Sequence, residues 1–283
     1  MKLIADAGST KIQWAVVNDC GHIHVSFTTP GLNPALIAPE ALVPEFTARL
    51  AEPLSGLRIN ECHYYGAGCL DHVIPHTEKA LAKVTRCPAA RAYSDLLGAA
   101  RALFPSGRGI ACILGTGSNS CIIDNGRITD HIPPLGYILG DEGSGAALGR
   151  RLIGDLLKRR LPEPLLHQWY ATNGLDYKEV IERVYRRPEA NKFLAAQTPF
   201  IADHITTPGI DRMVTDEMCR FLDRNVMAYA DAHNLPVGFC GSIAQVFGSQ
   251  LQSAASRLRL TIANIITAPL ERLVHYHHIH SNE

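Results

Sequence analysis

The chain has 283 residues, with 27 Lys and Arg balanced by 27 Asp and Glu, so its formal net charge at neutral pH is zero. This balance excludes a nucleic-acid or membrane surface that binds through bulk positive charge. At this length we expect about two domains or lobes, with a core that needs no disulfide or metal to form.

The predicted elements alternate between strands and helices. We expect strands at residues 2–7, 12–17, 23–27, 63–66, 110–114, 121–123 and 236–240, where short apolar runs are bounded by turn residues. We expect helices at residues 95–104, 144–160 and 211–232 and from residue 243, where apolar residues recur every three to four positions. This alternation indicates an α/β fold.

The beginning of the chain has a counterpart after residue 110. Gly8-Ser9-Thr10 separates the first two predicted strands, and Gly115-Thr116-Gly117-Ser118 separates a later pair. Aligning Gly8 with Gly117 places Ser9 on Ser118. We interpret this as an internal repeat, with each lobe opening on an antiparallel hairpin.

The two small-residue turns are candidate phosphate clamps. Glycine lets backbone N–H groups approach phosphate oxygens, and Ser or Thr hydroxyls add donors without bulk. Either turn alone also suits an ordinary hairpin, and neither a Walker loop nor a G-x-G-x-x-G motif is present. Only the duplicated arrangement favours two clamps that act on one triphosphate.

The eight cysteines are spread along the chain without a C-x-x-C pair. This spacing is typical of reduced thiols in a cytosolic protein, and we expect them to act as small core residues. The N-terminal apolar run is too short for a signal peptide, and no run approaches the roughly 18 residues of a spanning helix. We therefore expect a soluble, cytoplasmic protein.

Three segments together carry a resemblance to a known family. DAGSTK at residues 6–11, LGTGSNS at 114–120 and LGYILGDEGSGAALGRR at 135–151 resemble the BadF/BadG/BcrA/BcrD ATPase family. Within it, the chain is most similar to the N-acetylglucosamine kinases of the actin, sugar-kinase and heat-shock-chaperone superfamily. The resemblance covers essentially the whole chain and includes GLNP at 31–34, SDLLGAARAL at 94–103 and GFCGSIA at 238–244.

The resemblance implies a duplicated ribonuclease-H-like α/β fold, with two lobes and an ATP cleft between them. The N-terminal lobe would comprise residues 1–106 and 269–283, and the C-terminal lobe residues 107–268. It also implies ATP and Mg²⁺ as cofactors and leaves a homodimer open.

The resemblance assigns roles to individual residues. Asp6 would hold Mg²⁺, and Asp95 would be the general base and contact the sugar. The nucleotide would be bound by Gly8, Ser9, Thr10 and Lys11 in the first clamp, Thr116 and Gly117 in the second, and Gly241 and Ser242 beside the adenosine. The sugar would be bound by Asn33, Ser118, Asn119 and Asp141, with Leu135 and Gly136 lining its pocket.

Several of these residues have a purely structural alternative. Asp6 could be a strand-end turn residue and Asn33 a turn residue before Pro34. Asp95 precedes a predicted helix and could be its N-cap, as could Asp141 or Glu142 for the next helix. Leu135 stands where the family's animal enzymes would have an aromatic residue, which leaves the stringency for the N-acyl group open.

The expected function is an ATP- and Mg²⁺-dependent phosphotransferase with an alcohol group as acceptor. The first candidate reaction is conversion of N-acetyl-D-glucosamine to its 6-phosphate; glucosamine, N-acetylmannosamine and N-acetylmuramic acid stay open. One alternative is an ATPase that activates a dehydratase through a dimer-bridging iron–sulfur cluster, but Cys112 and Cys121 lie within predicted strands. The other is a non-catalytic amino-sugar sensor, against which Asp6 and Asp95 argue.

The terminal histidines, His275, His277, His278 and His280, predict a polar helix end, not a metal site.

Overall fold

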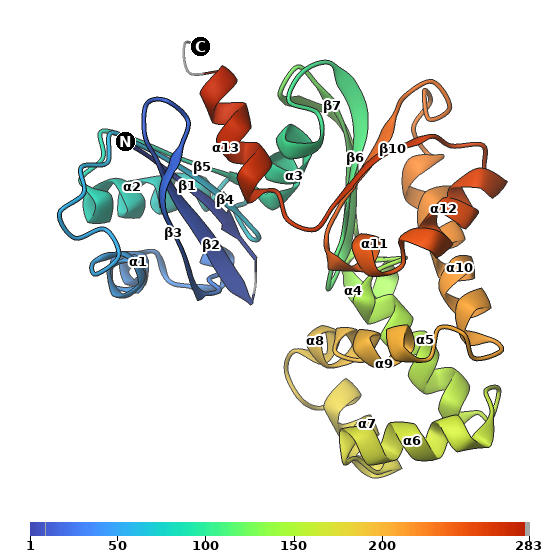
Figure 1. Cartoon of the computed structure of the whole chain (residues 1–283). Coiled ribbons are helices and arrows are strands. Elements are labelled where there is room, and N and C mark those ends of the chain that lie inside the picture. The colour runs from blue at the N-terminus through green and yellow to red at the C-terminus, as the bar shows by residue number, and fades with distance from the viewer. Residues whose placement is uncertain (9, 281–283) are drawn as a thin grey trace. The chain divides into compact units, whose positions relative to one another are not determined.

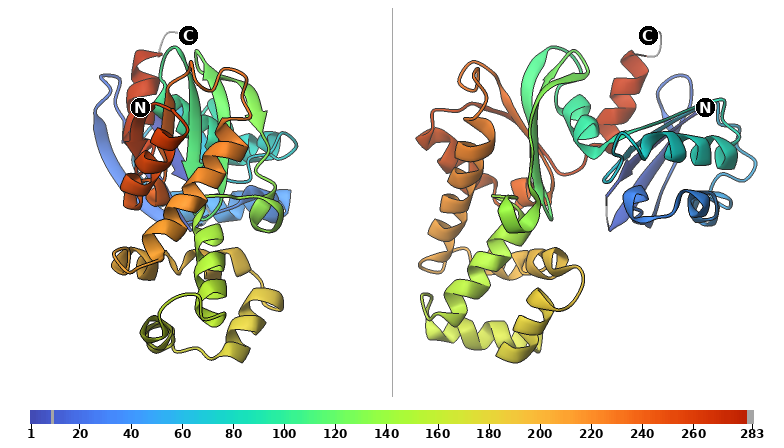
Figure 2. Two further views of the ribbon diagram at one scale, coloured as in Figure 1. Left: turned by 90° about the vertical axis from the view of Figure 1, so that its right-hand side faces the viewer. Right: turned by 180° about the vertical axis from the view of Figure 1, so that it is seen from behind.

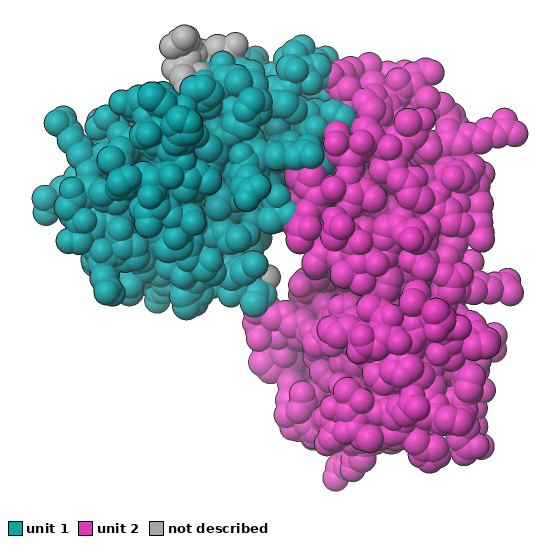
Figure 3. All heavy atoms as spheres, in the orientation of Figure 1, with its two compact units in different colours: residues 1–107, 123–128, 268–283 teal, residues 108–122, 129–267 magenta. Residues whose placement is uncertain are grey.

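A computed structural model describes residues 1–8 and 10–280 of the chain. These residues form two compact units, which Figure 3 colours separately. The first unit comprises Met1–Gly107, Ile123–Ile128 and Ala268–Glu283, and the second Arg108–Ile122 and Thr129–Thr267. Within the described ranges, no helix has both the length and the apolar character needed to cross a bilayer.

The first unit is built on a five-stranded sheet of order β3-β2-β1-β4-β5 (Figure 1). Its strands are β1 (Lys2–Ala7), β2 (Lys11–Val17), β3 (Ile23–Pro30), β4 (Glu61–Gly66) and β5 (Ala89–Ser94). β1, β2 and β3 form an antiparallel meander, whereas β4 and β5 run parallel to β1. The sequence missed β5, because its residues AARAYS at the sheet edge lack a run of β-branched side chains.

Helices cover both faces of this sheet. α1 (Leu42–Leu50) and α2 (Ile74–Thr85) pack against each other on one face, and α3 (Asp95–Leu103) and α13 (Leu270–Ile279) on the other. Two short 3-10 turns, η1 (Pro34–Leu36) and η2 (Pro39–Ala41), precede α1. α1 buries Leu42, Phe46 and Leu50, whose four-residue spacing places them on one side of the helix.

The second unit repeats the plan of the first. Its sheet has the order β10-β9-β6-β7-β8, with β6 (Arg108–Leu114), β7 (Ser118–Asp124), β8 (Arg127–Ile132), β9 (Val237–Cys240) and β10 (Ile262–Ile266). β9 runs parallel to β6 and β10 parallel to β9, as β4 and β5 follow β1. The predicted duplication is confirmed, but the predicted alignment is two residues out. The connections are residues 8–10 and 115–117, so Gly8 corresponds to Gly115 and not to Gly117.

Helices make up most of the second unit, and several of them form a group away from its sheet (Figure 2). The helices of the second unit are α4 (Gly136–Leu139), α5 (Gly145–Leu157), α6 (Glu163–Asn173), α7 (Tyr177–Tyr185), α8 (Ala190–Ala195), α9 (Thr198–Asp203), α10 (Ile210–Phe221), α11 (Ser242–Val246) and α12 (Gly248–Arg257). α5 packs against both α8 and α10 and so connects the helical group to the helices beside the sheet.

The helix predicted over residues 211–232 is shorter in the structure. α10 ends at Phe221 and continues as a single π-helical turn, η3 (Leu222–Val226), closed by a 2.8 Å bond from the amide of Met227 to the carbonyl of Leu222. Beyond this turn, the hydroxyl of the buried Tyr229 is hydrogen-bonded to that of Ser120 of β7 at 2.9 Å. A tertiary contact thus overrides the helical periodicity.

Two further expectations need correction. Six of the eight cysteines are buried, but Cys20 is exposed in the β2–β3 turn and Cys219 is half-buried on α10. The terminal histidines do not all form a polar helix end, because His277 is buried against the first sheet. No group of three or more His, Cys, Asp or Glu side chains within residues 1–8 and 10–280 is placed to hold a metal ion.

Candidate active site

In the first unit, the predicted metal ligand Asp6 and the predicted base Asp95 both lie where the parallel strands of the sheet end. The parallel strands β1, β4 and β5 are in register, with Asp6 opposite Tyr65 and Tyr65 opposite Tyr93. Their carboxyl ends therefore reach the same edge, which is where open α/β sheets bind ligands. Asp6 lies near the end of β1 and Asp95 directly follows β5.

Asp95 occupies the first turn of α3 but does not cap it. The N-cap is Ser94, whose hydroxyl accepts a hydrogen bond from the amide of Leu97 at 3.2 Å. One oxygen of Asp95 accepts from the amide of Leu96 at 2.8 Å. Burial raises the pKa of Asp95, and hydrogen bonds from the backbone amides of Leu96 and of Asp95 itself oppose the rise. The N-cap alternative is thus wrong, and the side chain that the resemblance assigns as the general base is not needed to cap the helix.

Asp6 is influenced by Asp95 and by Lys11. Burial, followed by repulsion from Asp95, raises the pKa of Asp6 to about 6, while Lys11 lowers it. Two carboxylates that repel each other at one sheet edge are a hard-oxygen donor set of the kind that Mg²⁺ prefers. A bound cation would relieve this repulsion, so these residues fit the metal role expected of Asp6.

The first small-residue turn lies next to these carboxylates. The amide of Gly8 donates to the carbonyl of Lys11 at 3.0 Å, and the amide of Gly31 donates to the carbonyl of Thr10 at 3.0 Å. Thr10 and Lys11 are exposed, and Ser9 lies outside the described residues. The exposed side chains leave the turn accessible to an anion, and its role as a phosphate clamp stays a prediction.

Asn33 is placed against the loop that follows β4. A Cβ atom on Gly68, whose φ is +81°, would come within 1.8 Å of the Asn33 side-chain oxygen, so only glycine permits this approach. The same oxygen accepts a hydrogen bond from the amide of Ala35 at 3.0 Å and caps η1. The turn role of Asn33 is therefore confirmed, and its contact with a sugar stays a prediction.

In the second unit, the predicted nucleotide residues lie at the corresponding sheet edge. The carbonyls of Gly115 and Thr116 accept from the amides of Gly145 and Ala146 at the start of α5, at 2.8 and 3.1 Å. Gly241, at the end of the neighbouring strand β9, has a φ of +128°, and a Cβ there would lie 2.2 Å from the carbonyl oxygen of Leu114. Glycine at this position lets the β9–α11 turn, which includes the exposed Ser242, approach the end of β6.

Asp141 lies over the second small-residue turn. One of its oxygens accepts from the amide of Ser118 at 3.3 Å, and a Cβ on Gly117 would lie 3.0 Å from the other. Burial and the charge of Glu142 raise the pKa of Asp141, whereas the amide of Ser118 and the charge of Arg150 lower it. Gly117, predicted to contact the nucleotide, and Ser118 and Asp141, predicted to bind the sugar, thus lie next to one another.

Asp141 and Glu142 are not helix caps. The N-cap of α5 is Ser144, whose hydroxyl accepts from the amide of Ala147 at 3.1 Å. Asp141 instead adopts a left-handed backbone conformation, with φ of 52°. For a residue other than glycine this conformation is strained, and such strain is often found at functional sites.

The remaining sugar candidates differ in accessibility. Leu135 also has a positive φ, 63°, and its side chain is 58% exposed just before Gly136 and α4. The side-chain oxygen of Asn119 is within 2.9 Å of both the amide of Ser120 and a ring nitrogen of His131. A sugar bound by Asn119 would therefore contact its amide nitrogen or displace one of these partners.

The sequence did not single out Arg224 and Asn225, which hold the side chain of Glu142 in the structure. Both lie in the segment predicted as a regular helix. They belong to a run of three polar residues, 223–225, that nothing in the sequence marked as functional.

The whole chain was compared with known proteins. Neither the protein-family models nor the curated proteins gave a match. Among solved structures, a protein from Porphyromonas gingivalis provisionally named N-acetylglucosamine kinase is 41% identical, with a TM-score of 0.93; the alignment covers 99% of this chain and 100% of that one.

Two more distant structures share the fold. A protein from Chromobacterium violaceum with the same provisional name is 18% identical over 97% of this chain and 98% of its own, with a TM-score of 0.71. A ROK-family glucokinase from Streptomyces griseus, solved with glucose and AMPPNP, is 15% identical over 97% of both chains, with a TM-score of 0.55. The resemblance seen in the sequence is confirmed: the chain belongs to the N-acetylglucosamine kinase-like family.

Proposed function

We propose that this chain is an ATP- and Mg²⁺-dependent sugar kinase that phosphorylates an amino sugar, with the 6-hydroxyl of N-acetyl-D-glucosamine as the first candidate acceptor. Family membership supports sugar phosphorylation. The name of the Porphyromonas gingivalis relative supports the choice of N-acetylglucosamine.

The observation that carries the proposal is the pair of carboxylates at the carboxyl edge of the first sheet. Asp95 would accept the proton of the attacking sugar hydroxyl, because its pKa is raised and Ser94 already caps the helix. Asp6 would hold Mg²⁺, which when bound supplies charge neutralisation to the phosphates. Phosphoryl transfer of this kind depends mainly on positioning and electrostatic stabilisation.

The remaining roles are proposed for residues of both units. Backbone groups of residues 8–11 and 116–117 would contact the phosphates, and Gly241 and Ser242 the adenosine. Asn33, Ser118, Asn119 and Asp141 would bind the sugar, beside Leu135 and Gly136. Substrates would then contact both proposed lobes, residues 1–106 with 269–283 and residues 107–268.

The iron–sulfur alternative receives no support from the cysteines near the second turn. Cys112 and Cys121 are both fully buried in strands, and burial raises the pKa of both thiols, that of Cys121 to about 12. Cluster ligands must be thiolates at a surface that two subunits share. The sensor alternative is less favoured because the carboxylate pair is retained.

The test is an assay of ADP release with N-acetylglucosamine, glucosamine, N-acetylmannosamine and N-acetylmuramic acid, each with ATP and Mg²⁺ and against a blank without sugar. We expect N-acetylglucosamine to give the highest kcat/KM. Release that is equal with and without sugar would support an ATPase activator. No release, with sugar binding seen by calorimetry, would support a sensor.

A further inference from the structure

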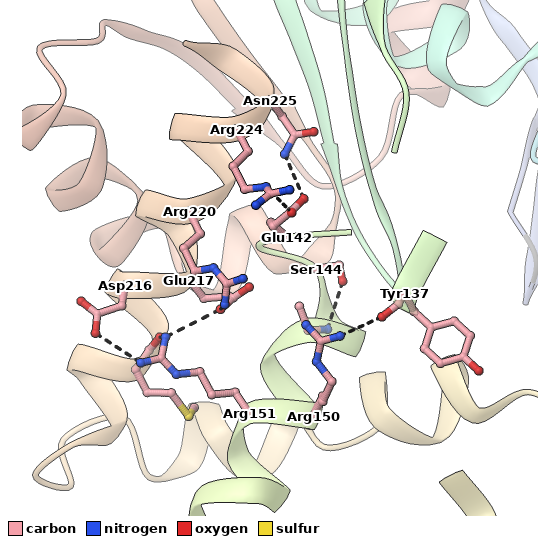
Figure 4. Close-up of polar contacts among 12 residues, drawn as sticks. Tyr137, Glu142, Ser144, Arg150, Arg151, Asp216, Glu217, Arg220, Arg224 and Asn225 are labelled. Atoms are coloured by element: carbon pink, nitrogen blue, oxygen red, sulfur yellow. Dashed lines mark hydrogen bonds and ion pairs between the residues drawn. The ribbon is translucent and has the colours of Figure 1, made fainter. Parts of the chain in front are cut away.

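A buried carboxylate next to Asp141 is held by two consecutive residues of η3 (Figure 4). The side chain of Glu142 is only 8% exposed. Its Oε1 lies 2.6 Å from Nε of Arg224, and its Oε2 accepts from Nδ2 of Asn225 at 3.3 Å. Both oxygens are thus engaged, as a buried charge requires.

The same π-helical turn is also connected to β7. The carbonyl of Asn225 accepts from the hydroxyl of Ser120 at 3.0 Å. The Ser120 hydroxyl in turn bonds to that of Tyr229, which accepts from the amide of Ile132 at 3.1 Å. η3 therefore links the segment of Asp141 and Glu142 to the strand that begins with Ser118 and Asn119. Isolated π-turns within helices are frequently found at functional sites.

Glu142 lies between two residues in left-handed conformations. Asp141 has φ of 52° and Gly143 has φ of 72°. A Cβ on Gly143 would lie 2.8 Å from the Cβ of Phe221, the residue just before η3. A strained turn of this kind persists only when its surroundings hold it. The Glu142 side chain is the polar anchor between the strained Asp141 and Gly143.

We propose that Arg224 is a positioning residue for sugar binding: by holding Glu142, it keeps the strained turn in the conformation that places the Asp141 carboxylate over Gly117 and Ser118. The inference deepens the proposed function and rests on it, because it takes Asp141 as a sugar ligand.

The electrostatic setting gives Arg224 a second effect on Asp141. The charged groups that face Asp141 are Glu142 beside it, Arg150 on α5 and, through Glu142, Arg224 on η3. The negative charge of Glu142 raises the pKa of Asp141, and Arg224 offsets that charge. Without Arg224, the pKa of Asp141 should rise further, so activity should be lost at a higher pH on the acid side.

Arg224 can be replaced without opening the core, because its side chain is 56% exposed. Arg220 provides a matched control. It lies one helical turn earlier, is 53% exposed, and pairs at 3.5 Å with a different buried carboxylate, Glu217. Arg224→Met and Arg220→Met thus remove the same charge from the same helix, but only the first releases Glu142.

The experiment compares steady-state kinetics of the two variants and the wild type across pH, using ADP release with N-acetylglucosamine. We expect Arg224→Met to raise the KM for sugar about tenfold with a smaller change in kcat, as lost substrate binding does. The acid limb of its pH–activity profile should move to higher pH. Arg220→Met should stay close to the wild type in both its KM for sugar and its pH–activity profile. Arg224→Lys should recover part of the loss, because it restores the charge without the guanidinium geometry.

A double variant tests whether the effect passes through Glu142. If it does, adding Arg224→Met to Glu142→Gln should change the KM for sugar far less than Arg224→Met does alone. Equal KM values and pH profiles for Arg224→Met and Arg220→Met, with normal wild-type turnover, would overturn the positioning role alone. Sugar-independent ADP release by the wild type would instead overturn the proposed function. If Arg224→Met fails to fold, Arg224→Lys serves as the test. The inference would be overturned if Arg224→Lys has an unchanged melting temperature, a wild-type KM for sugar and a wild-type acid limb of its pH–activity profile.

Discussion

Asp95 is the first residue of α3, and its neighbour Ser94 is the N-cap. The proposed catalytic role and the capping of the helix therefore belong to different residues. Asp95→Asn keeps the size of the side chain and a hydrogen-bond acceptor, but it cannot take a proton. We expect turnover to fall by about 10²- to 10⁴-fold, the usual contribution of a general base, while calorimetric affinities for sugar and ATP change little.

The melting temperature serves as the control for this variant. It should be no lower than that of the wild type in Asp95→Asn, because burial disfavours the Asp95 charge, but lower in Ser94→Ala, which loses about 1 kcal/mol of capping energy. If Asp95→Asn turns over like the wild type at saturating sugar, the base lies elsewhere.

Asp6 should destabilise the protein when no metal is bound. Its pKa in the folded state, about 6, lies above the usual value of 3.8, so the folded state binds more protons than the unfolded state between these two pH values. Stability should therefore fall as pH rises from about 4 to 6, and the penalty is fully present at pH 7.

Asp6→Asn removes this penalty. At pH 7 without Mg²⁺, we expect the variant to be more stable than the wild type by about 1–2 kcal/mol in urea unfolding, a figure discounted for partial solvent exposure. Turnover should nevertheless be low and need more Mg²⁺. A variant that is less stable than the wild type under these conditions would show that Asp6 has a structural role.

At the scale of elements, α13 is attached to the first sheet through a buried imidazole. The ring of His277 stacks on that of His63 at 3.8 Å, and its Nε2 lies 2.9 Å from the hydroxyl of Tyr65. Burial, with the nearby charges of His63, Arg101, Lys2 and His280, lowers the pKa of His277 to about 2. His63, which bonds to Glu61, also has a lowered pKa because of burial.

This arrangement predicts that the attachment is sensitive to acid. Only the unfolded state takes up a proton on His277 between about pH 6.5 and 2, so stability is present above pH 6.5 and is lost as pH falls. His277→Phe should reduce the difference in unfolding free energy between pH 7.5 and pH 5 by about 2 kcal/mol. The exposed His275, replaced by Gln, should leave this difference unchanged. An undiminished difference in His277→Phe would refute the prediction.

The sequence predicted elements well where local pattern and packing agree. β1 is an apolar run that matches its prediction at both ends, and the repeated pattern of strands and turns predicted the duplication. The helix over 211–232 was overestimated, because the hydroxyl contact of Tyr229 with Ser120 is tertiary. Glu142 was predicted only as a possible helix cap, since its partners Arg224 and Asn225 are about eighty positions away in the chain.

For the whole molecule, duplication gives each unit its own set of candidate residues for the proposed function. Each sheet places a short turn at the carboxyl end of its first strand, residues 8–10 in one and 115–117 in the other. The carboxylate pair of Asp6 and Asp95 belongs only to the first unit, and the strained Asp141 only to the second. The repeats have thus diverged: the proposed base and metal ligand lie in the first unit, and the proposed sugar contacts come from Asn33 of the first unit and from residues of the second.

The most direct test of this account follows the fate of the γ-phosphoryl group. The wild-type protein is incubated with γ-³²P-labelled ATP, Mg²⁺ and N-acetylglucosamine, and the products are separated. We predict that the label appears in a phosphorylated sugar, one for each ADP released, and that no label moves when the sugar is omitted. Label found only in inorganic phosphate, at the same rate with and without sugar, would contradict the proposal that this chain is a sugar kinase.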